Sequence, residues 1–307
     1  MADKARILSL DGGGAKGFYT LGALQEIEKL AGAPLHSCFH LIYGTSTGSI
    51  IAALLALGHS VEEIHELYSK HVPTIMKPLT PGGKSKALNA VAKEVFKERK
   101  FDRFKTDVGI VATNYDNETP MIFKTDVGLA HRGRHSFEPG FGCTIADAVQ
   151  ASCSAYPFFK AYKVTTHKKQ AIPVIDGGYC ANNPTLYAIA DALNALKVRP
   201  DRLRVVSLGV GLYPPPKRSA KDVAWWMNKY PGARFFQKTL EINTQSMDQL
   251  REVLYSHIPT VRISRTYNQP EMATDLLERD PTKLGLLHTR GIESFREHED
   301  KLKEFLD

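Results

Sequence analysis

The sequence predicts an α/β protein, with a mostly parallel central sheet between helices in three α/β/α layers. Along the 307 residues, short apolar segments typical of strands alternate with segments whose apolar residues recur at helical spacing. Glycine-rich turns follow three of the predicted strands, at residues 11–17, 44–48 and 176–178. Sites in such sheets form at the carboxyl ends of strands. We therefore expect the three turns to converge in space.

The first half of the chain gives clear signals for its elements. Strands are predicted at residues 6–10 and 41–43, and helices at 21–30, 49–57 and 61–71. Gly32 marks the end of the first helix, and Ser60 with Glu63 forms the pattern of a capping box before the third. The prolines and glycines between residues 73 and 83 predict a loop.

The second half continues the alternation and supports one division of the chain. Strands are predicted at residues 108–113, 121–123, 173–175, 204–210 and 260–264, and helices at 144–152, 184–197, 234–255 and 289–306. Three consecutive prolines at 214–216 make a stiff break. We expect a core over residues 5–212 and a C-terminal helical extension, residues 213–307, packed on the same domain.

The composition is that of an ordinary globular protein, with 43% apolar and 24% charged residues. The longest apolar run, residues 50–57, is far shorter than the roughly 20 residues of a transmembrane helix. The apolar stretch near the N-terminus is too brief for a signal peptide, so we expect a cytoplasmic protein. The four cysteines show neither metal-ligand spacing nor a disulfide framework, and we expect no metal or cofactor site.

The net charge of +7 is unevenly distributed. Residues 77–105 carry nine Lys or Arg and three acidic residues, a net charge of +6 (nine minus three). Such a stretch forms either a solvated face or a contact with an anionic membrane or a phosphate. The second interpretation makes it a candidate lid or membrane contact.

The turn at residues 44–48 (GTSTG) fits the GxSxG pattern of a nucleophile elbow. A predicted strand precedes it and an apolar helix follows, which is the context that such an elbow needs. The glycines permit a sharp turn that lifts the Ser46 hydroxyl towards a helix N-terminus, where negative charge is favoured. A serine that only caps the helix is the alternative.

The turn at residues 11–17 (DGGGAKG) has three interpretations. It satisfies GxGxxG, but the next predicted strand lacks the acidic residue that would hold a ribose. Alternatively, the exposed N–H groups of Gly13 and Gly14 form an oxyanion hole, or the segment is a plain turn. Lys16 either adds positive potential there or lies on the surface.

The third turn contains Asp176, followed by Gly177 and Gly178. An aspartate at a strand end can accept a proton from Ser46 if the two meet. A free carboxyl group with a pKa of about 3.9 is a poor base for a hydroxyl, and burial would raise that pKa. Read alone, Asp176 is equally a turn-forming residue.

Taken together and in this order, the three motifs resemble those of the patatin-like phospholipases, and the resemblance covers roughly residues 5–212. It implies the three-layer patatin-like fold and a Ser–Asp dyad without histidine. In that scheme Ser46 is the nucleophile, Asp176 the general base and Gly12 to Gly14 the oxyanion hole. The motif glycines are Gly17, Gly44, Gly48, Gly177 and Gly178. A Ser-His-Asp triad would need a late histidine, and His257, His288 and His298 lie in no motif.

A narrower resemblance is to the bacterial antiphage (CBASS) phospholipase effectors, which a cyclic dinucleotide activates. It implies a cyclic GMP-AMP type of activator, membrane phospholipids as substrate, peripheral action at the inner membrane and assembly into a homo-oligomer on activation. It implies no nucleic-acid partner. Residues 213–307 hold aromatic and Arg side chains that suit a nucleotide or ordinary packing: Trp225, Trp226, Tyr230, Arg234, Phe235, Phe236, Arg262, Arg265 and Tyr267.

We therefore expect a lipid acyl hydrolase of the phospholipase A type that acts through Ser46 and Asp176. Aromatic residues that line an acyl groove or pack in the core are Tyr156, Phe158, Phe159 and Tyr162. Two alternatives remain open. One is a constitutive small-ester hydrolase or thioesterase on the same dyad, and the other is a noncatalytic nucleotide-binding module that uses residues Gly12 to Gly17.

Overall fold

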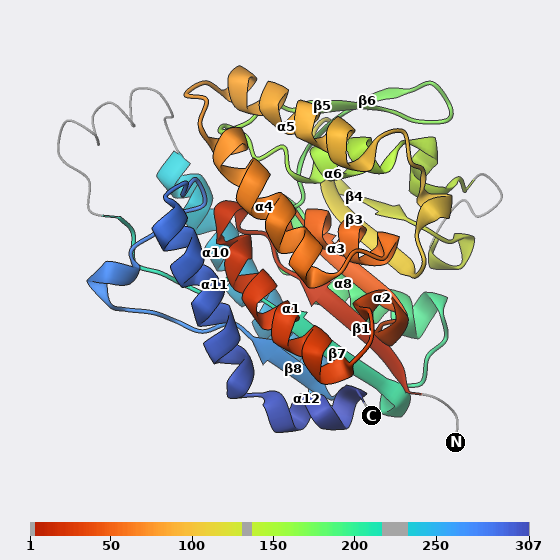
Figure 1. Cartoon of the computed structure of the whole chain (residues 1–307). Helices are drawn as coiled ribbons and strands as arrows, with labels where there is room; N and C mark the ends of the chain where they lie inside the picture. Colours follow the sequence, from red (N-terminus) through yellow and green to blue (C-terminus); the bar gives the residue numbers. More distant parts are fainter. Residues whose placement is uncertain (1–3, 131–136, 217–232, 307) are drawn as a thin grey trace.

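A computed structural model describes residues 4–130, 137–216 and 233–306 (Figure 1). One eight-stranded sheet runs through this part of the chain, in the order β5-β6-β3-β2-β1-β7-β8, with β4 paired to β3 beside that path. The strands are β1 (Ala5–Leu10), β2 (Leu41–Thr45), β3 (Asp107–Asn114), β4 (Thr119–Lys124), β5 (Tyr162–Thr165), β6 (Ala171–Asp176), β7 (Leu203–Leu208) and β8 (Thr260–Ile263).

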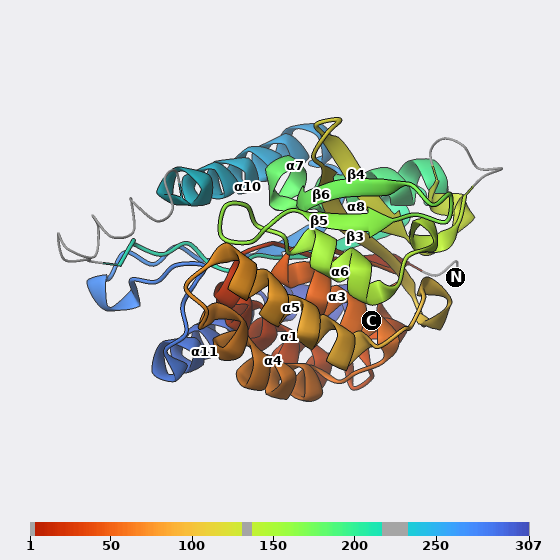
Figure 2. The same cartoon turned by 90° about the horizontal axis from the view of Figure 1, so that it is seen from above.

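Helices cover both faces of this sheet (Figure 2). They are α1 (Gly17–Ala31), α2 (Leu35–Cys38), α3 (Thr47–Leu57), α4 (Val61–Met76), α5 (Pro81–Phe96), α6 (Ile145–Ser152), α7 (Gly178–Ala181), α8 (Thr185–Ala190), α10 (Ala233–Tyr255), α11 (Pro281–Arg296) and α12 (Glu299–Leu306). Helices α1, α3, α4, α5, α6 and α11 form one layer, and α7, α8 and α10 form the other. The predicted three-layer α/β/α class is confirmed.

Strand direction divides the sheet into two parts. Strands β3, β2, β1, β7 and β8 are mutually parallel, as expected. Strands β4 and β6 run antiparallel to β3, and β5 runs antiparallel to β6. The glycine turn at residues 176–178 therefore reaches the site from the direction opposite to the other two turns.

Alternation along the strands builds two apolar cores. On β1, Leu8 and Leu10 face the larger cluster beneath α1 and α3, whereas Ile7 faces the smaller cluster beneath α8. All three side chains are almost fully buried. Because both faces are covered, the central strands are mostly apolar, which is typical of a parallel sheet between helices.

The loop predicted at residues 73–83 is confined to residues 77–80, so both of its ends were misplaced. Helix α4 continues through Pro73 to Met76, and α5 begins at Pro81. A proline is favourable in the first turn of a helix, and the Thr80 hydroxyl accepts the Gly83 N–H at 3.1 Å as a cap. The helix predicted at 184–197 is also shorter, since α8 ends at Ala190 and a π-helical turn follows.

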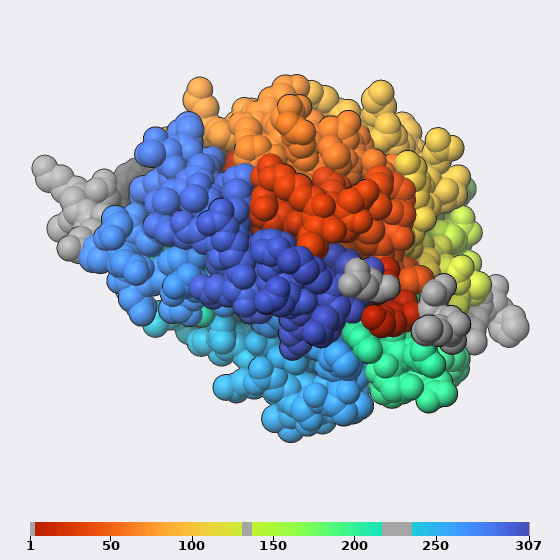
Figure 3. Space-filling view, turned by 60° about the horizontal axis from the view of Figure 1, so that its bottom comes forward, coloured from red at the N-terminus to blue at the C-terminus, as the bar shows by residue number. Residues whose placement is uncertain are grey.

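The C-terminal region is integrated with the rest of the chain. The predicted strand at 260–264 is confirmed, and β8 extends the sheet beside β7. The helix predicted at 289–306 is instead the pair α11 and α12. Helix α11 lies against α1, which Figure 3 shows as adjoining blue and orange-red surfaces. The division at residue 212 stays a prediction.

Within the described ranges, we find no helix long and apolar enough to cross a membrane.

Candidate active site

Ser46 lies at a sharp turn between β2 and α3, as the elbow pattern predicts. Its backbone has φ 52° and ψ −122°, a conformation that a non-glycine residue adopts only under strain. A Cβ atom on Gly44 would lie 2.3 Å from the Gly48 carbonyl oxygen, and one on Gly48 would lie 2.3 Å from the Leu10 carbonyl oxygen. Both glycines are therefore required by close backbone packing around the turn.

The Ser46 hydroxyl donates to the Oδ2 atom of Asp176 at 2.7 Å. It makes no capping bond to α3, so the side chain is directed to the carboxylate and not to its own helix. The Ser46 N–H donates to the Ser152 Oγ atom at 2.9 Å, and that hydroxyl donates to the Val111 carbonyl at 2.6 Å. Ser152 thus holds the elbow, a role that no sequence motif indicated.

Asp176 is 1% exposed. Burial raises its pKa from 3.8 to about 7, against the opposing effect of hydrogen bonds from the Gly178 N–H and the Ser46 hydroxyl. The Gly178 N–H binds Oδ1 at 2.7 Å, which leaves Oδ2 for Ser46. A carboxyl group with such a pKa can take a proton from a hydroxyl and return it near neutral pH.

The sheet explains how two residues 130 positions apart meet. Thr45 on β2 pairs with Val111 on β3, and Asp176 on β6 pairs with Ala112, the next residue of β3. Strand β3 therefore lies between β2 and β6, and its pairing with both strands brings Ser46 and Asp176 to the same height in the sheet. The predicted convergence of residues 44–48 and 176–178 is confirmed by this register.

The glycine loop before α1 lies next to Ser46. A Cβ atom on Gly12 would be 3.2 Å from the Ser46 Cβ atom and 2.4 Å from the Asn182 Oδ1 atom. The Gly12 N–H donates to the Asn182 carbonyl at 2.9 Å, so its inclusion among oxyanion donors is wrong for this conformation. In the described part of the chain, no hydrogen-bond acceptor faces the N–H groups of Gly13 and Gly14. These two donors remain available.

Two charged residues of the same loop, Asp11 and Lys16, are buried and paired with residues far away in the sequence. Both Asp11 oxygens accept from Arg262 of β8, at 3.0 and 2.5 Å, and Arg262 also donates to Ser207 at 2.8 Å. Arg262 is thus part of the fold, so of the two interpretations given for it, a nucleotide contact and ordinary packing, these contacts favour packing. Lys16 is 4% exposed and therefore does not lie on the surface. Its Nζ atom lies 3.6 Å from the Glu241 Oε1 atom, and burial lowers the pKa of Lys16.

A pocket of about 960 Å³, including open solvent at its mouth, contains Ser46, Asp176 and the glycine loop. Most of its wall is apolar, and examples are Ile50, Val72, Ile75, Leu88, Phe159 and Leu240. Of the four aromatic candidates, only Phe159 lines it. Phe158 is buried against Phe236, Tyr162 donates to Asp147 at 2.6 Å, and Tyr156 is exposed.

The remaining candidates lie elsewhere. His288 packs against His65 with ring centroids 4.4 Å apart, and none of the three late histidines lines the pocket. Arg265 pairs with Glu297, and Tyr267 stacks on Tyr213. Trp225, Trp226 and Tyr230 lie outside the described residues, as does the side chain of Arg234.

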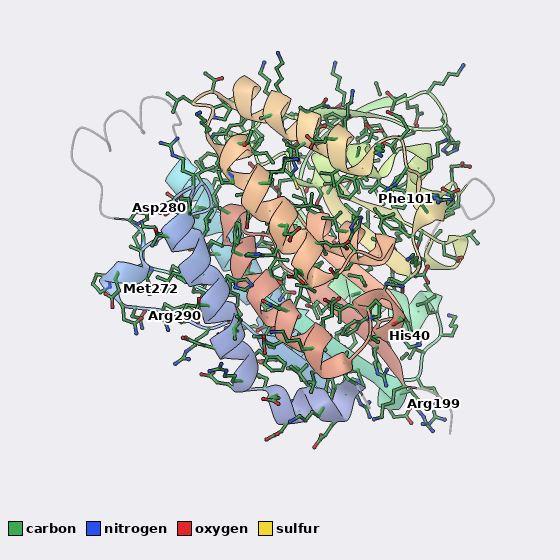
Figure 4. All side chains as sticks on the ribbon, in the orientation of Figure 1. His40, Phe101, Arg199, Met272, Asp280 and Arg290 are labelled. Atoms are coloured by element: carbon green, nitrogen blue, oxygen red, sulfur yellow. The ribbon has the colours of Figure 1, made fainter. Side chains whose placement is uncertain are left out.

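A second hollow is separate from this pocket. It is lined by residues such as His40, Phe101 and Lys105, at the starts of the central strands. Figure 4 places His40 and Phe101 towards one end of the molecule, and Met272 and Asp280 towards the other. Leu276, between the latter two in sequence, lines the pocket of Ser46. The two hollows therefore occupy opposite ends of the sheet.

A strained serine at a nucleophile elbow, bonded to a buried carboxylate beneath an apolar pocket, places this chain among the serine hydrolases. Comparison with known families makes this class specific. The sequence model for patatin-like phospholipases matches residues 8–189, and the chain belongs to that family.

Named relatives agree with this assignment. A protein of Escherichia coli named cUMP-AMP-activated phospholipase is 55% identical over 306 residues, covering 98% of this chain and 93% of its own length. A protein of Pseudomonas aeruginosa named cGAMP-activated phospholipase is 26% identical, covering 92% and 84% respectively. The crystal structure of VipD from Legionella pneumophila is similar over 98% of this chain and 67% of its own, with TM-score 0.53 and 14% identity. That last likeness concerns the fold alone.

Proposed function

We propose that this phospholipase cleaves ester bonds of membrane glycerophospholipids with Ser46 as nucleophile and Asp176 as general base. The 2.7 Å hydrogen bond from the Ser46 hydroxyl to the buried Asp176 carboxylate is the observation that carries the proposal. The apolar wall above it suits an acyl chain.

The geometry supports a two-step reaction. Ser46 Oγ attacks the ester carbonyl carbon as its proton passes to Asp176 Oδ2. The N–H groups of Gly13 and Gly14 stabilise the resulting oxyanion, each such donor contributing roughly 3 kcal/mol. Collapse breaks the ester bond, and the leaving lysophospholipid oxygen takes the proton from Asp176. Water then attacks the acyl-Ser46 ester, giving its proton to Asp176, and the fatty acid leaves as Ser46 regains a proton.

We further propose that a cyclic dinucleotide activates the enzyme in antiphage defence. The support is the names of the relatives: the 55% identical protein is named as cUMP-AMP-activated and a 26% identical one as cGAMP-activated. The cUMP-AMP molecule is therefore the first candidate, beside the expected cyclic GMP-AMP type. Peripheral action at the inner membrane and assembly into a homo-oligomer on activation belong to the same proposal.

The experiment measures fatty-acid release from phosphatidylethanolamine and phosphatidylglycerol vesicles, with cUMP-AMP, with cGAMP and with neither. We expect release with one nucleotide, reduced about 10³-fold or more in Ser46→Ala and Asp176→Asn. Ser37→Ala, an exposed serine on α2, is the matched control and should retain full activity.

Other outcomes separate the alternatives. Release without any nucleotide, lost in both dyad variants, would remove the activation and keep the phospholipase. Preference for short-chain esters or thioesters would favour the small-ester hydrolase. Tight NAD or ATP binding that survives Ser46→Ala, with no hydrolysis of any ester, would overturn the enzyme and favour the nucleotide-binding module.

A further inference from the structure

Large apolar side chains are exposed around the mouth of the Ser46 pocket. Leu79 is 55% exposed, Tyr156 52% and Phe235 77%. They come from three segments, yet each lies within three positions of a residue that lines the pocket, namely Met76, Ala155 and Phe236. Exposed apolar groups gathered at a binding site indicate an interaction surface, whereas isolated ones do not.

Contacts join these segments into one surface. The Tyr179 hydroxyl donates to the Tyr156 carbonyl at 2.9 Å, and the Tyr179 ring lies 4.9 Å from that of Phe236. On the other side, the Lys160 N–H donates to the Ser85 Oγ atom of α5 at 2.9 Å. We call residues 76–86, 155–160 and 235–240 the mouth rim.

The charged side chains of the mouth rim are all basic, and Glu241, which follows the rim and lines the pocket, pairs with Lys16. The mouth rim contains five lysines and no Asp or Glu. Lys77, Lys86, Lys160 and Lys238 are exposed. Lys84 is instead 4% exposed and donates to the Met76 carbonyl at 2.5 Å. The side of the mouth at Leu276 differs, because its neighbours Asp275 and Glu278 are acidic.

We propose that the mouth rim docks on an anionic phospholipid bilayer. Leu79, Tyr156 and Phe235 enter the lipid, and the exposed lysines contact the anionic head groups. This docking rests on the proposed function and deepens it, because it lets a phospholipid acyl chain pass from the bilayer into the pocket without crossing water. It also narrows the membrane contact expected over residues 77–105 to the part that adjoins the pocket.

Helix α10, which contributes Phe235 to the mouth rim, also exposes apolar residues that do not line the pocket. Val253 and Leu254, near the end of α10, are 78% and 56% exposed, but neither lines the pocket. If exposed apolar area alone determined docking, as in a contact with a second copy of the chain through α10, Val253 and Leu254 would take part as much as the mouth rim. Docking of the mouth rim on a bilayer does not involve Val253 or Leu254.

The test measures vesicle binding in a Ser46→Ala parent, which leaves the lipid intact. Binding to phosphatidylglycerol and to phosphatidylcholine vesicles is followed by co-sedimentation, with and without cUMP-AMP. We expect binding that prefers phosphatidylglycerol, weakened at least 10-fold by combining Leu79→Ser, Tyr156→Ser and Phe235→Ser. The Val253→Ser, Leu254→Ser control should bind as the parent does.

A second readout separates docking from catalysis. With Ser46 intact, the triple rim variant should lose vesicle hydrolysis and keep hydrolysis of a soluble short-chain ester. If no ester is hydrolysed by the unmodified enzyme, the proposed function fails, while vesicle binding by the Ser46→Ala parent still tests docking. Docking is overturned if the parent binds no vesicle, if the triple variant binds unchanged, or if the control weakens binding equally.

Discussion

In the proposed mechanism the residue that governs the chemistry is Asp176, because burial raises its pKa. A carboxyl group with an ordinary pKa would hold its charge firmly and give Ser46 little help. The raised pKa of about 7 lets the same group bind and release a proton during each half of the reaction. No histidine lines the pocket within the described residues, so this carboxyl group is the base the geometry offers.

We predict that kcat/KM for a soluble ester rises with pH and levels off above an inflection near 7, because only ionised Asp176 accepts the Ser46 proton. Initial rates from pH 5 to 9 check this, with circular dichroism to verify the fold at each pH. A profile that is flat across this range would contradict the role of Asp176.

The same raised pKa has a consequence for stability. The unfolded carboxyl group titrates near 3.8 and the folded one near 7, so the folded state binds more protons between these values. Stability contributed by Asp176 therefore falls as pH rises from about 4 to about 7. Asp176→Asn should unfold at a higher temperature than the parent at pH 8, with a smaller difference at pH 4.5.

The sequence predicted the dyad but not its support. Ser46 and Asp176 lie in glycine motifs whose spacing and strand context are visible in the sequence. Ser152 accepts a hydrogen bond from the Ser46 N–H, and the Gly12 N–H donates to the Asn182 carbonyl instead of facing the site. Such pairings depend on how distant segments meet, and no local pattern of residues encodes them.

Among the elements, helices α1 and α11 cross in close contact. A Cβ atom on Gly291 of α11 would lie 1.9 Å from the Tyr19 carbonyl oxygen, and one on Gly22 of α1 would lie 2.0 Å from the His288 carbonyl oxygen. Each glycine faces the backbone of the other helix. The two helices therefore lie closer together than they could with a Cβ atom at either position. This contact anchors the C-terminal helices on the rest of the fold.

We predict that Gly291→Ala lowers the free energy of unfolding by about 1–3 kcal/mol, because its methyl group forces the helices apart. Gly285 of the same helix has open space around it. Gly285→Ala should therefore raise stability by about 0.5–1 kcal/mol through helix propensity. Urea unfolding of both variants checks the pair, and equal effects would contradict the close crossing.

Elements with strong periodicity were predicted well, and the errors have physical causes. Helix α5 begins with proline and two glycines, which usually mark a loop, but a Thr80 cap and Pro81 in the first turn start a helix there. Strand β5 was not predicted, because its four residues alternate in burial only through pairing with β6. Local capping decided the first case and tertiary pairing the second.

In the whole molecule, the Asp11–Arg262 pair links the first motif to the last strand. Arg262 is 251 positions from Asp11, and both side chains are largely buried. The pair helps to join the glycine loop to β8, so residues beyond 212 contribute to the site. The sequence left Arg262 open between a nucleotide contact and ordinary packing, because an isolated arginine gives no sign of its partner.

We predict that Arg262→Met destabilises the fold by about 3–5 kcal/mol, because it leaves the Asp11 carboxylate buried and unpaired. Adding Asp11→Asn should recover part of that loss. Arg265→Ala, which removes a half-exposed pair with Glu297, should cost about 1 kcal/mol or less. Denaturant unfolding of the parent and the three variants forms the test, and a cost for Arg262→Met as small as that for Arg265→Ala would contradict it.

The link between Asp11 and Arg262 also bears on when, during synthesis of the chain, the site can form. A ribosome releases the glycine loop and the elbow long before it has added residue 262. Until then Asp11 has no cation to neutralise it, and the edge of β7 is uncovered. The glycine loop therefore takes its final support only once β8 has joined the sheet, and we expect a chain truncated before residue 260 to lack a competent site.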